Sequence, residues 1–174
     1  MQGALECLGM PYTGSGVLGS ALGMDKLRTK RQASAVGIAT AESMVLSSAD
    51  DLGPALERLG LPLIVKPATQ GSSVGMSKVE RAADLPAAYD AAAAVDSSVF
   101  AEAWITGAEY TVAILQGRAL PSIRIETPNT FYDYQAKYFR DDTQYHCPSG
   151  LAPEAEKHLG ALARAAFEAV GAEG

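Results

Sequence analysis

The sequence predicts an α+β fold in which an antiparallel sheet has helices packed on one face. Short segments that alternate apolar and polar residues are typical of strands. Other segments are rich in alanine, or begin after serine or aspartate and end at glycine, as helices do. The last strand-like segments are separated only by a short "QGR" turn at 116–118, which favours an antiparallel meander.

The individual elements follow from these patterns in chain order. Residues 1–9 have the spacing of an amphipathic helix that ends at Gly9, and 10–16 are expected to form a short buried strand. Asp25 is expected to cap a helix that ends at Gly37, because its side-chain oxygen can accept hydrogen bonds from the first turn. Further helices are expected at 52–60, 82–96 and 154–174, and extended segments at 39–47, 61–67, 75–80, 98–105, 109–115 and 120–127.

The bulk composition excludes several classes of protein. The 174 residues include 14 basic and 20 acidic side chains, and a net charge of −6 provides no extended cationic face for nucleic acid. No apolar run approaches the roughly 18 residues of a membrane span, and the first residues do not resemble a signal peptide. Cys7 and Cys147 lack metal-site or disulfide spacing. We therefore expect a cytoplasmic protein with reduced thiols that binds a small phosphate ligand.

The stretch 64–79, "IVKPATQGSSVGMSKV", places a glycine-flanked polar loop between two strand-like runs. Glycine permits positive φ angles and close approach, so backbone N–H groups from Gly71 to Gly75 are suited to hold an anion, with Lys66 at the base of the loop. The alternative is a flexible hairpin with a solvated lysine, and the loop alone does not decide between the two. It is not a Walker motif, because GxxxxGK[ST] is absent.

A possible nucleoside pocket follows in "VFAEAWITGAEYTV", where a period of two places Phe100, Glu102 and Trp104 on one face of a strand. A carboxylate beside an indole suits a purine, which needs both a polar partner and a stacking surface. Glu109, after the turn-like "TGA", could bind a ribose diol. The alternative is a solvent-facing glutamate next to a tryptophan of the core.

Residues 128–150 have neither helical nor strand period and are rich in aromatic residues. A long segment of this kind in a compact domain is usually an active-site lid or disordered, and its aromatic residues favour a lid. Lys137 could close on a terminal phosphate there, and Tyr138 could orient a substrate or transfer a proton. The default alternative is that both are exposed surface residues. Lys26 could likewise belong to a solvated basic helix face.

Together these stretches resemble the D-alanine–D-alanine ligase family of the ATP-grasp superfamily. The resembling runs are "GMPYTGSGVLGSALGMDKLRTK", "LPLIVKPATQGSSVGMSKV", "FAEAWITGAEYTVAIL", "LPSIRIE" and "TFYDYQAKYFRDDTQYHCP", in family order over essentially the whole chain. The set with "FYDYxAKY" narrows the resemblance to this ligase and to relatives that make D-alanyl depsipeptides. In this family ATP phosphorylates one D-alanine, and the amine of a second attacks the acyl phosphate to form the dipeptide for peptidoglycan.

The resemblance also implies roles for residues of this chain. The implied ATP-binding residues are Lys26, Lys66, Gly71, Ser72, Ser73, Val74, Gly75, Glu102, Trp104 and Glu109. Ser72 and Tyr138 match a hydrogen-bonded group that positions the first D-alanine, and Lys137 matches a lid lysine near the γ-phosphate. The family also uses Mg²⁺, but its metal ligands match no part of this chain and are expected beyond Gly174.

The resemblance divides the chain into three parts of an incomplete ATP-grasp fold. Residues 1–22 correspond to the end of an N-terminal substrate domain, 23–107 to the central subdomain with phosphate loop 66–75, and 108–174 to a truncated C-terminal subdomain with the lid 128–150. The family is commonly homodimeric. Because the metal ligands are expected outside this chain, we expect a fragment without ligase turnover. The alternatives are a degenerate ATP-binding module and a depsipeptide ligase relative.

Overall fold

The computed structural model describes residues 1–127 and 143–174, and these form two compact units. One unit contains Ala41–Gly107, and the other contains Met1–Thr40 with the described residues from Ala108 onward. This contact-based division differs in kind from the three-part division expected from the sequence, which stays a prediction.

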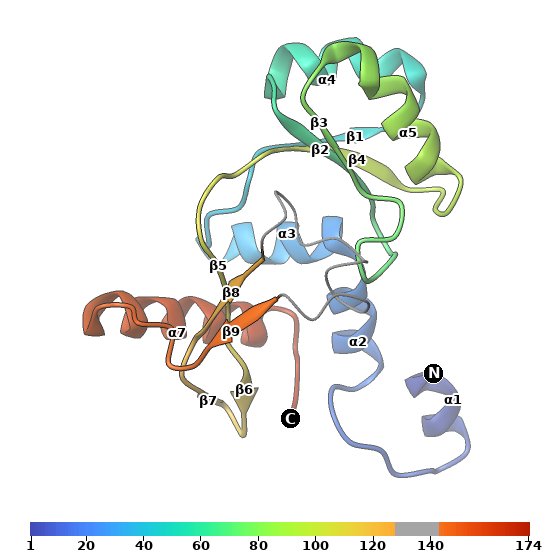
Figure 1. Ribbon diagram of the computed structural model, residues 1–174. Helices are drawn as coiled ribbons and strands as arrows, with labels where there is room; N and C mark the ends of the chain where they lie inside the picture. Colours follow the sequence, from blue (N-terminus) through green and yellow to red (C-terminus); the bar gives the residue numbers. More distant parts are fainter. Residues whose placement is uncertain (128–142) are drawn as a thin grey trace. The chain divides into compact units, whose positions relative to one another are not determined.

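The unit Ala41–Gly107 is built on a four-stranded antiparallel sheet (Figure 1). Its strands, in spatial order, are β1 (Ser43–Leu46), β4 (Val99–Ala103), β2 (Leu63–Pro67) and β3 (Ser77–Val79). Leu63 and Val65 point to one face of β2 and are fully buried. The strands expected around 61–67, 75–80 and 98–105 are therefore present.

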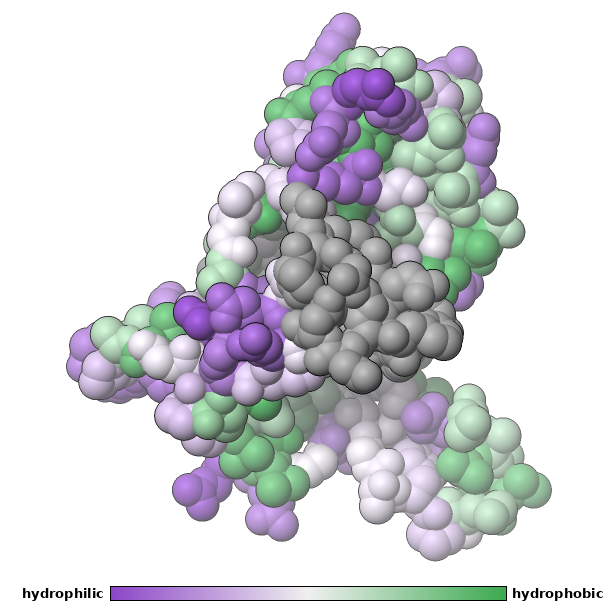
Figure 2. All heavy atoms as spheres, viewed as in Figure 1, coloured by the Kyte–Doolittle hydropathy of each residue, from purple (hydrophilic) through white to green (hydrophobic). Residues whose placement is uncertain are grey.

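Two helices cover one face of this sheet, as expected from the sequence. They are α4 (Leu52–Leu59) and α5 (Leu85–Ala93), and they lie on the same side of the strands in Figure 1. Ala55 of α4 and Ala88 and Ala92 of α5 pack with the sheet in one hydrophobic core. Pale green, weakly hydrophobic residues mark the position of the alanine-rich α5 in Figure 2. The opposite face of the sheet has neither helix against it.

Local sequence signals set the ends of α4. A short 3-10 turn, η1 (Ala49–Asp51), precedes it, and Ser48 and Asp51 form a capping box there. Asp51 Oδ2 accepts hydrogen bonds from the Ser47 and Ser48 amides, and Ser48 Oγ accepts one from the Asp50 amide. The helix ends at Gly60, whose φ of 66° is accessible to glycine at little cost.

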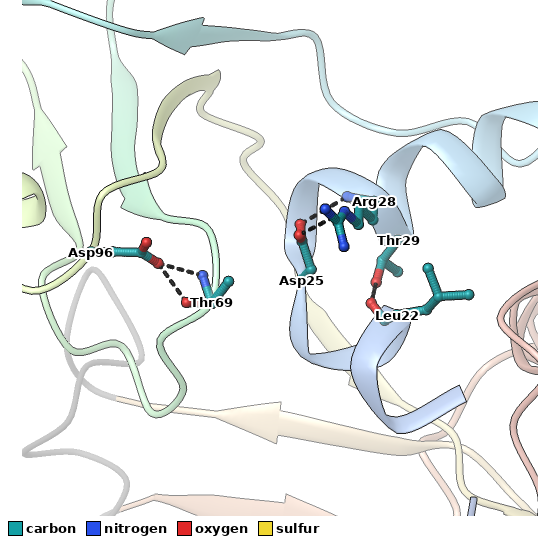
Figure 3. Close-up of polar contacts among 6 residues, drawn as sticks. All are labelled: Leu22, Asp25, Arg28, Thr29, Thr69 and Asp96. Carbon is teal, nitrogen blue, oxygen red and sulfur yellow. Dashed lines mark hydrogen bonds and ion pairs between the residues drawn. The ribbon is translucent and has the colours of Figure 1, made fainter. Parts of the chain in front are cut away.

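The other unit combines helices with two small sheets. Its elements are α1 (Gln2–Cys7), α2 (Val17–Met24), α3 (Lys26–Ala35), β5 (Glu109–Thr111), β6 (Ile114–Leu115), β7 (Arg118–Ala119), β8 (Ile123–Glu126), β9 (Gln144–His146) and α7 (Pro153–Ala169). Strands β5, β8 and β9 form one antiparallel sheet, and β6 and β7 form a hairpin. The expected cap of α3 is present, because the Arg28 amide donates to Asp25 Oδ1 at 3.0 Å (Figure 3).

Three local expectations were wrong. Residues 10–16 contain no strand, because Gly14 has a φ of 90° and interrupts the extended run. Strand β4 does not continue into a meander with β5, since both of its edges are already paired, with β1 and β2. The two later segments do pair antiparallel, β5 with β8, and the turn between them lies at Gln116 and Gly117 in the β6–β7 hairpin.

The third wrong expectation concerns the proposed lid. Residues 144–146 lie inside the range 128–150 that was expected to lack structure, yet they form β9 by pairing with β8. Tyr145 pairs with Ile125 and His146 with Arg124, so cross-strand pairing supplies what local periodicity did not indicate. In the described part of the chain, no helix combines the length and the apolar character required to cross a membrane.

Candidate nucleotide-binding site

Lys66 and Glu102 form an ion pair on the face of the four-stranded sheet opposite α4 and α5. The Lys66 ammonium lies 2.7 Å from Glu102 Oε1, and the two side chains are only 18% and 14% exposed. They come from neighbouring strands, because Lys66 belongs to β2 and Glu102 to β4. A partly desolvated pair is held firmly, and removing one partner leaves the other charge poorly compensated.

The sheet register explains why these side chains share a face. Ile64 pairs with Glu102 on one side and with Lys78 on the other. Directly paired residues of an antiparallel sheet project to the same face, and residues two apart on one strand do as well. Lys66, Glu102 and Lys78 therefore share the face of this unit that α4 and α5 do not cover, which we call the helix-free face.

The loop that follows β2 has an unusual backbone. Ser72 and Ser73 have φ angles of 54° and 60°, a region that residues other than glycine seldom adopt. The Val74 amide donates to the Gly71 carbonyl at 3.1 Å, which closes a tight turn with both central residues at positive φ. Such turns usually contain glycine or asparagine there. Serines in this conformation indicate a hydroxyl retained at some cost in backbone strain.

Asp96 ties the start of this loop to the connection between α5 and β4. Asp96 Oδ2 accepts hydrogen bonds at 2.7 Å from both the amide and the hydroxyl of Thr69 (Figure 3), and Oδ1 accepts one from the Ser98 amide. Gln70 Nε2 also donates to the Val95 carbonyl. The loop is therefore anchored at its entrance, and the expectation of a merely flexible hairpin is not supported there.

Gly75 anchors the other end of the loop by close packing. A Cβ added at this position would lie 2.6 Å from Val95 Cγ2 and 3.3 Å from Pro67 Cγ, and the φ of Gly75 is 69°. By contrast, a Cβ at Gly71 would meet no atom within 4 Å. Of these two glycines, Gly75 is therefore the one that neither the available space nor the backbone conformation allows to be replaced easily.

Trp104, one residue beyond β4, lies against a lysine. The Lys78 ammonium is 4.7 Å from the centroid of the Trp104 ring, within the range of a cation–π contact. Lys78 also forms an ion pair with Glu80 at 2.7 Å. The half-buried Trp104 was expected beside Glu102 as an aromatic stacking surface, and it lies at the end of the same strand.

The other predicted residues divide between two places. Lys26 and Glu109 belong to the second compact unit, at the start of α3 and of β5 respectively. Lys137 and Tyr138 lie outside the described residues. Lys26 occupies the first turn of α3, where the helix dipole disfavours cations by about 0.3–1 kcal/mol, so its position offers no electrostatic benefit to the helix.

The comparison with protein families decides the family. The model described as "D-ala D-ala ligase C-terminus" matches residues 33–174. The chain belongs to the D-alanine–D-alanine ligase family. It is 57% identical over its whole length to the D-alanine–D-alanine ligase of Halorhodospira halophila, and 56% identical to that of Ectopseudomonas mendocina. The chain spans 57% and 56% of the length of these relatives.

Solved structures of two similar ligases confirm the α+β ATP-grasp fold. The crystal structure of D-alanine–D-alanine ligase from Bacillus anthracis matches with a TM-score of 0.85 and 36% identity, covering 99% of this chain and 57% of that one. The crystal structure of the VanG D-Ala:D-Ser ligase from Enterococcus faecalis matches with a TM-score of 0.83 and 32% identity, covering 99% and 52%.

The described residues, 1–127 and 143–174, contain no cluster of three or more His, Cys, Asp or Glu side chains suited to bind a metal ion. The lysines and the loop amides, in contrast, are suited to the phosphate groups of a nucleotide.

Asp96, Thr69 and Lys78 were missed by the sequence reasoning. Asp96 has a recognisable signal, since an aspartate two residues before a serine often accepts a hydrogen bond from that serine's amide in an Asx turn. Lys78 also has a signal in the sequence, because alternation in "MSKV" places its side chain on the other face of the strand from the buried Val79. The Thr69–Asp96 contact joins residues 27 apart and has no local signature.

Proposed function

We propose that this chain carries the nucleotide-binding part of an ATP-dependent ligase that joins two D-alanines for peptidoglycan synthesis. The observation that supports it most is the Lys66–Glu102 pair on the helix-free face, at the start of the strained serine loop. Membership of the family supplies the reaction class. The chain spans 57% of its relatives, so the complete reaction is attributed here only by proposal.

The proposed binding mode uses the two halves of the site differently. Lys66 neutralises phosphate charge, and the backbone amides from Gly71 to Gly75 donate to phosphate oxygens. Trp104 stacks on the adenine, and Glu102 keeps the Lys66 ammonium in place until the nucleotide binds. Lys26 and Glu109 are proposed to contact a phosphate and the ribose diol.

The proposed reaction has two steps. The γ-phosphoryl group passes from ATP to the carboxylate of one D-alanine, with ADP leaving, and the amine of the second D-alanine then displaces phosphate from the acyl phosphate. Ser72, Lys137 and Tyr138 are proposed to position the first D-alanine and the transferred phosphoryl group. Mg²⁺, when bound in the whole ligase, would neutralise the phosphate charge.

Thermal unfolding with and without millimolar ATP tests the binding proposal. A ligand that binds the native state raises the melting temperature, so ATP should stabilise the 174-residue wild type. In Lys66→Met the ATP-induced shift should largely disappear, because a charge-assisted contact of about 1.5–3 kcal/mol is removed. Arg58→Met, which removes only an exposed pair with Glu42, should keep the shift. No shift in the wild type would contradict the proposal.

Activity and binding are separable in this chain. We propose that the 174-residue chain alone makes no measurable D-alanyl-D-alanine, and a coupled assay for ADP and dipeptide would refute this by detecting either product above background. ATP binding without turnover would also fit the alternative of a degenerate nucleotide-binding module. The match to a D-Ala:D-Ser ligase indicates that the second substrate should be assayed as D-alanine, D-serine and D-lactate.

A further inference from the structure

Lys78 occupies a constrained position on the helix-free face of the four-stranded sheet. Its side chain is 16% exposed, and its ammonium lies 4.7 Å from the Trp104 ring centroid and 2.7 Å from Glu80 Oε1. A lysine has a flexible four-carbon stem, and an exposed one samples many rotamers. Here two contacts hold the ammonium over the indole.

The strand register places Lys78 where it can act on Trp104. Lys78 and Glu102 both pair with Ile64, so they lie in one row across the sheet. Trp104 follows two residues after Glu102, and its amide donates to the Pro62 carbonyl at 3.2 Å. The Trp104 backbone is thus fixed by the sheet, and the Lys78 ammonium makes a cation–π contact with the ring.

The counter-ions distinguish Lys78 from Lys66. Lys66 pairs with Glu102, whose side chain is 14% exposed, whereas Lys78 pairs with Glu80, whose side chain is 67% exposed. Exposed carboxylates contribute little to holding an ammonium group. The ring face of Trp104 therefore accounts for much of the position of Lys78, and by reciprocity Lys78 restrains the ring.

We propose that Lys78 is a positioning residue that holds the Trp104 indole in place for stacking against the base of the bound nucleotide. The proposal rests on the proposed function, in which Trp104 contacts the base. A ring that is ordered before binding loses less side-chain freedom when the ligand arrives. Lys78 therefore acts through Trp104 and needs no contact with the phosphates.

Fluorescence of the ligand-free protein tests the restraint directly, because Trp104 is the only tryptophan in the sequence. In Lys78→Met the indole should become more mobile, with lower emission anisotropy and stronger acrylamide quenching, whereas Lys78→Arg should keep the cation–π contact and resemble the wild type. Arg81→Met is the matched control, since it removes a charge of the same unit that pairs with Asp84. Unchanged anisotropy and quenching in Lys78→Met would overturn the proposal.

Binding measurements by calorimetry separate the base from the phosphates. Lys78→Met should bind ATP about three- to tenfold more weakly, the range expected from losing one cation–π contact, and should bind inorganic tripolyphosphate like the wild type. Equal weakening for both ligands would make Lys78 a phosphate contact and overturn the proposal. Tighter ATP binding by Lys78→Met would show competition with the base, which would also overturn it. If the wild type binds no ATP, the proposed function fails, while the fluorescence result still decides whether Lys78 restrains Trp104.

Discussion

At the scale of single residues, the serines of the loop have a conformation that a glycine would adopt with less strain. Ser72 and Ser73 both have positive φ angles within one tight turn. A left-handed conformation costs an L-residue about 1–2 kcal/mol, and such strain is usually found where a side chain is needed for function. The loop sequence "GSSVG" at 71–75 thus contains two glycines and two serine hydroxyls.

Substituting Ser72 tests this strain. Ser72→Gly and Ser72→Ala both remove the hydroxyl, but only glycine relieves the backbone, so Ser72→Gly should be more stable by about 1 kcal/mol. Urea unfolding at neutral pH measures the difference between the two variants. Equal stability would show that the φ of 54° stores no strain.

Gly75 is expected to be the least replaceable glycine of the loop. Gly75→Ala should destabilise the chain by about 1–3 kcal/mol, because the new methyl group meets Val95 at 2.6 Å and the backbone is left-handed. Gly71→Ala is the matched control, with open space around its Cβ. Adding Val95→Ala should restore part of the loss. Equal unfolding free energies for the two glycine variants would contradict this account.

Sequence reasoning at this scale recovered residues whose role is local. The Asp25 cap depends on the three residues after it, and the glycine loop on neighbours in the chain, so both could be predicted. The Thr69–Asp96 and Lys78–Trp104 contacts join residues that are 27 and 26 positions apart. Such pairs depend on strand register, which the sequence pattern alone did not determine.

At the scale of elements, a buried polar cluster fixes the start of α7. Glu156 accepts a hydrogen bond at 2.7 Å from the Ser122 amide and another from the Ser122 hydroxyl. Ser122 is fully buried, and Ser149 lies 2.6 Å from its hydroxyl. The hydrogen bonds from Ser122, first that of its side chain and then that of its amide, hold the pKa of Glu156 below its ordinary value.

This lowered pKa predicts a pH-dependent contribution to stability. A carboxylate whose pKa falls on folding stabilises the native state above its unfolded value, near 4.5, and that contribution is lost as the pH decreases through the folded value. Glu156→Gln should therefore be less stable than the wild type at pH 7, and the gap should narrow below pH 4.5.

Denaturant unfolding across this range checks the prediction. Glu154→Gln is the control, because Glu154 lies in the same first turn of α7 without the Ser122 contacts. At pH 7 its stability difference from the wild type should be smaller than that of Glu156→Gln. If the stability difference between Glu156→Gln and the wild type stays constant as the pH falls, the hydrogen bonds from Ser122 do not stabilise the ionised carboxylate.

Most elements could be predicted, because their signals lie within the segment. Caps and alanine content predict the helices α4 and α5, and alternation of apolar and polar residues predicts the strands β2, β3 and β4. The short strand β9 could not be predicted, since Gln144–His146 is extended by pairing with β8 and has no local period. The pairing of β4 with β1, and not with β5, likewise depends on tertiary structure, which local patterns do not determine.

At the scale of the whole molecule, family membership and site geometry support each other only in part. The unit Ala41–Gly107 brings together Lys66, Glu102 and the serine loop. Lys26 and Glu109 belong to the other unit, and Lys137 and Tyr138 fall outside the described residues. The structure therefore shows the contacts of Lys66 and Glu102 and the backbone of the serine loop, while the ATP-binding role that the order of motifs predicts for them stays a prediction.

Calorimetric titration of ATP into the 174-residue chain, with and without Mg²⁺, tests the central claim most directly. The account predicts saturable binding of one ATP per chain, with affinity reduced about tenfold or more in Lys66→Met, since a charged contact is lost. Arg58→Met should bind ATP like the wild type. Absence of binding to the folded wild type in both conditions, or equal affinity in Lys66→Met, would contradict the account.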